Sequence, residues 1–369
     1  MEAAVIEQSG KAISMYQVVM ILMLSIGLNN HVIIIPLLLH AAGRDAWFAS
    51  LLSALPIAFM VIFLQYVLNI TKQKRIGVWL RERISSFSTK SLLFVLAVPL
   101  FFEAVITLRD TTYWAKLSFL ETTPHVAILI SLAAVCLYAA YAGLGSIAVI
   151  SGMLLPLVVF FGLFVMTANF PHKDISLLFP LMENGLTPVL KGVLYTLSGL
   201  LEVFCLLAMQ HYIKGKIRYW MLVVTVLLLT ELVTGPTYGI ISEFGIAEAM
   251  NLRYPPFEEW RIVTLGYHWS NVDFLAIFQW MAGALIRISL SLFLVVDLFG
   301  ITSPPKRLWW LVVLFTIASL IALLPISDMQ FFDLLYKLIV PGQFIWWMAI
   351  GCLIPLIVWG LSRKRVQMK

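Results

Sequence analysis

The chain has 369 residues, of which 61% are hydrophobic and only 12% are charged, and its mean hydropathy is +0.96. Soluble globular domains carry about 25% charged residues, so this composition excludes a soluble domain and indicates a polytopic membrane protein. The formal net charge of +6 requires no nucleic-acid partner, because most Lys and Arg residues fall in loops expected beside anionic lipid on the cytoplasmic side.

Ten apolar stretches are long enough to span a bilayer, whose hydrocarbon core is crossed by about 20 helical residues. They are expected at 16–39, 47–70, 92–113, 126–141, 147–168, 188–211, 220–241, 272–298, 308–325 and 340–361. Residues 1–10 contain neither a basic leader nor a small-residue cleavage site, so we expect the first stretch to be retained as a span. The distribution of Lys and Arg then predicts that both termini are cytoplasmic.

The ten stretches divide into two sets of five, 16–168 and 188–361. Five crossings are an odd number, so the second set must enter the membrane from the opposite side, as in the inverted repeats of many secondary transporters. Residues 242–271, between the seventh and eighth stretches, are long enough to form an external lid. The sequence therefore predicts one all-α transmembrane domain over 1–369, built as a five-plus-five inverted repeat.

The first stretch of each set is interrupted near its middle by glycine and polar residues. The segments are MLSIGLNNHVIIIP at 23–36, with Gly27, Asn29 and Asn30, and LYTLSGLLEVF at 194–204, with Thr196, Ser198 and Gly199 before Glu202. Paired interruptions at matching depth indicate a binding site near the midplane, because unwound backbone is tolerated in a membrane only beside a cavity. We expect free N–H and C=O groups there to bind a carboxylate and an ammonium group.

Four charged residues are expected close to the middle of the membrane, and three of them, Glu103, Glu202 and Arg287, are candidates for ion pairing or ligand contact. A buried guanidinium needs a carboxylate, so Arg287 should pair with Glu202 or Glu103. Each residue has two interpretations, a ligand or coupling group and a structural ion pair. Arg287 could replace the cation of sodium-coupled transporters, although Ser289 and Ser291 could still ligate an ion.

The other sequence patterns give less evidence for a binding or catalytic site. Glu231 precedes TGPTYG, where the glycine spacing and the proline favour helix packing or a hinge over ligand contact. No Walker, HExxH, GxSxG or paired CxxC pattern occurs, so the sequence does not predict an enzyme. The three cysteines lie in expected spans and indicate neither disulfides nor a metal site, and no cofactor is expected.

Several segments resemble the B subunit of bacterial spore germinant receptors, a permease-like family of the amino acid–polyamine–organocation superfamily with a LeuT-type fold and broken first and sixth helices. The segments are KAISMYQVVMILMLSIG, LYTLSGLLEVFCLLAM, YPPFEEWRIV and RISLSLFLVVDLFG. The resemblance extends over nearly the whole chain. It implies a spore inner-membrane protein that binds a nutrient germinant, commonly an amino acid, and acts with a larger A subunit and a lipoprotein C subunit.

Carried onto this chain, the resemblance implies a pocket between the first, third, sixth and eighth spans. Its residues would be Gly27, Leu28, Asn29, Asn30, Phe102, Val105, Ile106, Thr196, Ser198, Gly199, Leu200, Glu202, Arg287, Ser289 and Ser291. Ligand binding would tilt the first and sixth helices against the other spans. A proton-coupled amino acid permease, in which Glu202 or Glu103 titrates, is the alternative, and a scaffolding subunit without a ligand would not need two interrupted helices.

Overall fold

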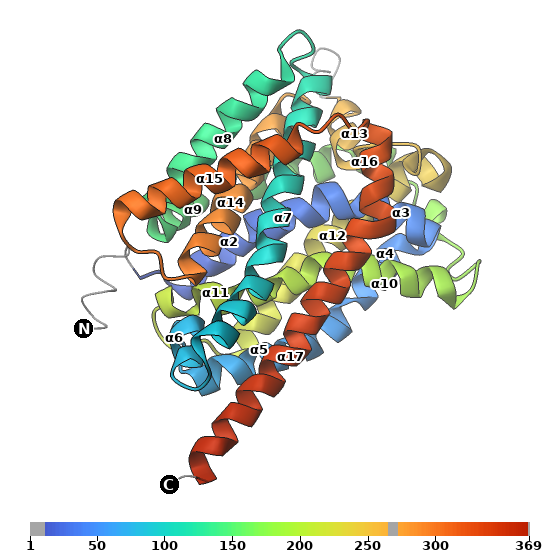
Figure 1. Ribbon diagram of the computed structural model, residues 1–369. Helices are drawn as coiled ribbons and strands as arrows, with labels where there is room; N and C mark the ends of the chain where they lie inside the picture. Colours follow the sequence, from blue (N-terminus) through green and yellow to red (C-terminus); the bar gives the residue numbers. More distant parts are fainter. Residues whose placement is uncertain (1–11, 265–271, 368–369) are drawn as a thin grey trace.

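A computed structural model describes residues 12–264 and 272–367, and within them the regular structure is helical apart from one isolated bridge between Ile13 and Ile213 (Figure 1). In these residues, nine helical stretches are long and apolar enough to cross a membrane. The predicted class, an all-α polytopic membrane protein, is therefore confirmed. The count of ten spans and the inverted repeat stay predictions.

The first of the nine stretches, Met15–Thr71, is 57 residues long. It consists of α2 (Met15–Leu28), the π-helix η1 (Asn29–Ile34), α3 (Ile35–Ala42), the 3-10 turn η2 (Gly43–Asp45), α4 (Ala46–Leu52) and α5 (Ala54–Thr71). Gly43 has φ +59°, which favours glycine and lets the chain turn between α3 and α4. At 1.5 Å per residue the stretch would measure about 85 Å, so it has room for two crossings of a core of about 30 Å.

The remaining elements follow the expected spans, with small shifts at most ends. They are α6 (Ile76–Arg81), α7 (Ser86–Ser118), α8 (His125–Ala142), α9 (Leu144–Ala168), η3 (Phe170–His172), η4 (Ile175–Leu178), α10 (Leu186–Leu200), η5 (Leu201–Cys205), α11 (Leu206–Met209), η6 (Gln210–Tyr212), α12 (Tyr219–Ala249), α13 (Pro255–Arg261), α14 (Leu275–Leu298), α15 (Pro304–Ala322), α16 (Asp328–Leu334), η7 (Leu335–Ile339) and α17 (Val340–Gln367).

The segment expected to form a lid, 242–271, is only partly irregular. Helix α12 continues past the expected end at 241 to Ala249 and bends at Gly245, where φ is +69°. The short helix α13 follows, and residues 265–271 lie outside the described residues. Whether this segment acts as an external lid stays a prediction.

Two helical stretches form the centre of the bundle. In α14 and in Leu186–Tyr212, 89% of the apolar window is buried, whereas the value is 17% for α9 and 22% for α15. Helix α14 packs against α2, α7, α8 and α9. In Figure 1, α8, α9 and α15 lie on one side of α14, with α3, α4 and α10 on the other. Polar side chains of α14 are therefore held away from lipid, as their cost in hydrocarbon requires.

Both expected interruptions occur as changes of helix type rather than as unwound turns. Helix α2 continues into η1 at Asn29, and α10 continues into η5 at Leu201. A π-helix bonds each N–H to the carbonyl five residues back and a 3-10 helix to the one three residues back, so the hydrogen-bond register changes and a carbonyl can be skipped at a junction. Pro36, which lacks an N–H, follows η1. The expected unwound turns are therefore corrected to changes of helix type, and the binding of a ligand by backbone N–H and C=O groups there stays a prediction.

Candidate functional site

A buried ion pair joins the sixth expected span to the eighth. Arg287 of α14 donates from Nη1 to Glu202 Oε2 at 2.5 Å and from Nη2 to Glu202 Oε1 at 2.7 Å. The side chains are 1% and 2% exposed. Such bidentate, charge-assisted bonds are among the strongest polar contacts in proteins, and two charges buried this deeply require them. Of the two carboxylates considered from the sequence, Glu202 is the one that Arg287 binds.

Further hydrogen bonds connect this ion pair to α2, η1 and α7. Asn29 Nδ2 donates to Glu202 Oε1 at 3.2 Å, so the π-helical segment contacts the 3-10 segment directly. Arg287 also donates from Nε to Thr107 Oγ1 at 2.9 Å and from Nη1 to the carbonyl of Ser25 at 3.1 Å. A movement of either interrupted helix must therefore strain or break bonds to the ion pair.

Glu103 of α7 lies close to this network but is held by different partners. Trp347 Nε1 donates to its Oε1 at 3.2 Å, and Ser291 Oγ donates to its Oε2 at 3.4 Å. The residue is 3% exposed, and within the described residues its carboxylate has no cation within 4 Å. Glu103 is therefore a buried carboxyl group that only neutral donors contact.

Asn30 of η1 presents unpaired polar atoms at the contact between the two interrupted helices. The residue is fully buried, and neither Nδ2 nor Oδ1 has a hydrogen-bond partner in the described part of the chain. A Cβ atom added to Gly199 of α10 would collide with Asn30 Oδ1, so the two helices approach closely only because residue 199 has no side chain. A buried amide without partners costs about 1–3 kcal/mol, so Asn30 has unused hydrogen-bonding capacity at this contact.

The other residues of the expected pocket do not all face one space. Thr196, Ser198 and Ser289 donate to the backbone carbonyls of Gly192, Tyr195 and Cys136, respectively. Val105, Ile106 and Leu200 are buried. Phe102 is 48% exposed, so its side chain does not point into the bundle. The structure therefore joins Asn29, Glu202 and Arg287, whereas the hydroxyl groups of Thr196, Ser198 and Ser289 bond to backbone and Phe102 lies apart.

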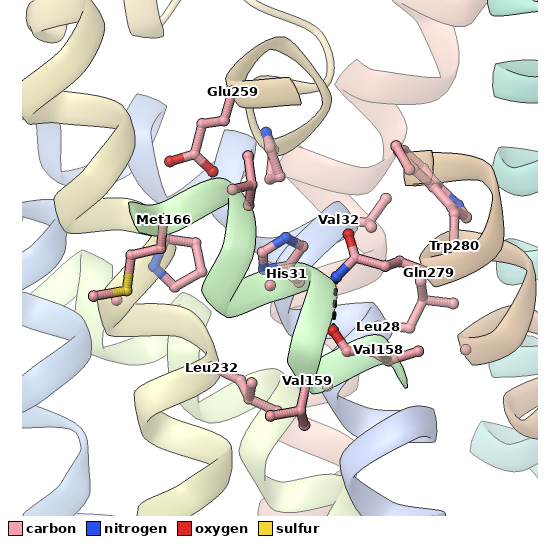
Figure 2. A pocket seen from close by; sticks show the side chains of 18 of the residues that line it. Leu28, His31, Val32, Val158, Val159, Met166, Leu232, Glu259, Gln279 and Trp280 are labelled. Carbon is pink, nitrogen blue, oxygen red and sulfur yellow. Dashed lines mark hydrogen bonds between the residues drawn. The ribbon is translucent and has the colours of Figure 1, made fainter. Parts of the chain in front are cut away.

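A cavity of about 280 Å³ opens beside the ion pair network, between α2–η1, α9, α12, α13 and α14; we call it the interhelical cavity (Figure 2). Gly27 and Leu28 are the members of the expected pocket that line it. His31, which lies in the same polar segment, also lines it, as do Gln279 and Trp280 of α14. The sequence analysis did not assign these three to a site, because only the packing of α9 and α12 beside α2 creates the space.

The end of the interhelical cavity formed by α13 carries buried charge. Lys173 Nζ lies 3.5 Å from Glu243 Oε1, and Asn169 Nδ2 donates to the Glu259 carbonyl at 2.7 Å. The Glu259 side chain, on α13, lines the cavity. Burial and the nearby charge of Glu243 raise the pKa of Glu259 well above its usual range. This end of the cavity therefore holds two carboxyl groups, Glu243 and Glu259, and one cation, Lys173, which pairs with Glu243.

Comparisons with known proteins agree with the sequence and the fold. The model of the family described as "Spore germination protein" matches residues 12–331. Spore germination protein XB of Bacillus anthracis is 36% identical over 353 residues, which cover 96% of this chain and 99% of that protein. The match extends over every membrane-spanning stretch up to α16 and confirms the resemblance noted from the sequence. The chain therefore belongs to the spore germination permease family.

Proposed function

We propose that this protein is the nutrient-binding membrane subunit of a spore germinant receptor. The nutrient, most simply an amino acid, would bind near the midplane where α2 and α10 change helix type. The observation that carries the proposal is the bidentate bond between Glu202 and Arg287 together with its link to Asn29. The charges of Glu202 and Arg287 and the unpaired amide of Asn30 all lie at the contact between the two interrupted helices.

In this proposal the protein works by a population shift. A ligand that binds Asn30 and the ion pair better in one arrangement of α2 and α10 favours that arrangement. The size of the shift in population is limited by the difference in the ligand's affinity for the two arrangements. The protein would lie in the spore inner membrane with both termini in the cytoplasm. It would pass the change to a larger A subunit and a lipoprotein C subunit.

The test uses Gly199→Ala in purified protein reconstituted into liposomes. The added methyl group displaces Asn30, so binding of labelled amino acids from a panel should weaken at least about tenfold, the equivalent of 1.4 kcal/mol. Gly342→Ala is the matched control, because a Cβ atom there meets no atom within 4 Å. Equal affinities of wild type and Gly199→Ala for every amino acid that binds would contradict a site at this contact.

A proton-coupled permease is the second candidate, and Glu103 is the observation that favours it. A buried carboxyl group held by neutral donors can take up and release a proton as its surroundings change. Uptake into the same liposomes separates the two functions. Accumulation that requires a pH gradient and is lost in Glu103→Gln or Glu202→Gln indicates a carrier, whereas saturable binding without accumulation indicates a sensor.

A further inference from the structure

We propose that the interhelical cavity is a second binding site, which takes a small organic ammonium ion with an apolar body and holds its charge at Glu259. The site is separate from the central network, because neither Glu202 nor Arg287 lines the cavity. The proposal goes beyond the nutrient site and does not depend on it.

Two carboxylates line the cavity, Glu231 and Glu259, and of these Glu259 is the buried one that forms no ion pair within the described residues. Lys173, a lining residue, is engaged by Glu243, whose side chain is fully buried. Glu259 is 7% exposed, and no hydrogen bond or ion pair involves its carboxylate within the described residues. Figure 2 shows Glu259 reaching from α13 toward Met166 at the edge of the cavity. A buried carboxylate that faces a cavity and forms no ion pair is suited to bind a cationic ligand.

Three aromatic side chains line the same cavity as Glu259. Phe257 and Trp260 of α13 and Trp280 of α14 line the cavity, and all three are at most 7% exposed. The faces of such rings attract ammonium ions. Trp260 Nε1 donates to Gln279 Oε1 at 3.0 Å, and Gln279 Nε2 donates to the Val158 carbonyl at 2.9 Å, the bond drawn in Figure 2. The Gln279 amide therefore fixes this wall.

Apart from His31 and Glu231, the rest of the wall is apolar and suits the body of the ion. It is formed mainly by Leu155, Val159, Leu163, Met166, Val32 and Leu232. A volume of about 280 Å³ is far more than one water needs, and apolar walls favour a hydrocarbon body over several waters. His31 and Gly27 lie in the same wall, so an occupant would touch α2 and η1 directly.

The test measures binding of n-butylammonium chloride to the full-length protein in lipid nanodiscs, with n-butanol and butyrate as probes of similar size. Saturable binding of n-butylammonium, and not of the other two, is expected. Glu259→Gln should weaken it at least about tenfold, since it removes a charge-assisted bond. Glu258→Gln is the matched control, because that neighbour is half-exposed and pairs with Arg261.

A second pair of variants keeps the test valid if Glu259→Gln folds poorly. Val159→Trp fills the cavity from α9 and should also abolish n-butylammonium binding, whereas Leu157→Trp, exposed on the same helix and not a lining residue, should leave it unchanged. Equal binding of n-butanol, unchanged affinity in both Glu259→Gln and Val159→Trp, or no saturable binding by the wild type would each overturn the proposal. Amino acid binding measured in the same nanodiscs reports on the nutrient site separately.

Discussion

Replacing Glu202 by glutamine should destabilise the protein strongly, because it leaves a buried guanidinium without its carboxylate. Arg287 is 1% exposed and would lose its counter-ion, and glutamine has only one oxygen to accept the two bonds at 2.5 and 2.7 Å. Glu103 is bonded to Trp347 and Ser291 and does not replace the lost partner. Breaking one side of a buried ion pair costs about 3–5 kcal/mol, a large part of the 5–15 kcal/mol that usually separates folded from unfolded protein.

A double variant separates the loss of the ion pair from the destabilisation caused by a buried charge without a partner. In Glu202→Gln/Arg287→Met the charge is gone, so this double variant should be more stable than Glu202→Gln by about 2–4 kcal/mol. The free energy of unfolding is measured in dodecylmaltoside micelles titrated with dodecyl sulfate, followed by tryptophan fluorescence. Glu258→Gln, which removes an exposed pair, should cost at most about 1 kcal/mol. The reasoning is refuted if Glu202→Gln unfolds like Glu258→Gln, or if the second substitution restores nothing.

Two further substitutions can be tested in the same assay. Arg253→Ala removes ion pairs to two aspartates and should lower the free energy of unfolding by about 1–3 kcal/mol. Arg261→Ala, at an exposed pair, is the control and should lower it by less than about 1 kcal/mol. Similar losses in the two variants would refute the larger contribution of Arg253. Gly283→Ala places a Cβ atom 2.8 Å from Leu28 Cβ and should destabilise the protein by about 1–3 kcal/mol. Gly342→Ala is the control and should be neutral or stabilising. The opposite order of stabilities would contradict close packing of α14 on α2.

Much of the fold could be predicted because it depends on local properties of the chain. Hydropathy over about 20 residues marks a span wherever it packs, and the spacing of charges gives their depth. Depth alone indicated Glu202 or Glu103 as the partner of Arg287, and the structure pairs Arg287 with Glu202. The rotation of a helix about its axis, which decides which side chains face the bundle, could not be predicted in this way. Phe102 shares its depth with Val105 and Ile106, yet it is exposed and they are buried.

The form of the helix interruptions and the interhelical cavity could not be predicted for a related reason. Glycine and asparagine weaken a helix, but a π-helix, a 3-10 helix and an unwound turn all accommodate them, and neighbouring helices decide among the three. The cavity depends on α9, α12 and α13 lying around α2, and these segments are far apart in the sequence. Glu259 in YPPFEEWRIV carried no local signal that distinguishes it from Glu258, which is more exposed.

The contacts between α2 and the stretch that follows α10 constrain how the two can move. Near the midplane Asn29 is bonded to Glu202. At the start of α2, the N–H of Ile13 donates to the Tyr212 carbonyl at 2.9 Å, and the N–H of Lys214 donates to the Ile13 carbonyl at 2.8 Å. Two segments joined at both points cannot slide independently without breaking one set of bonds. A ligand that shifts the equilibrium must therefore move α2 and the 186–212 stretch together, and the bidentate bond to Arg287 is the contact with α14 that such a movement must strain.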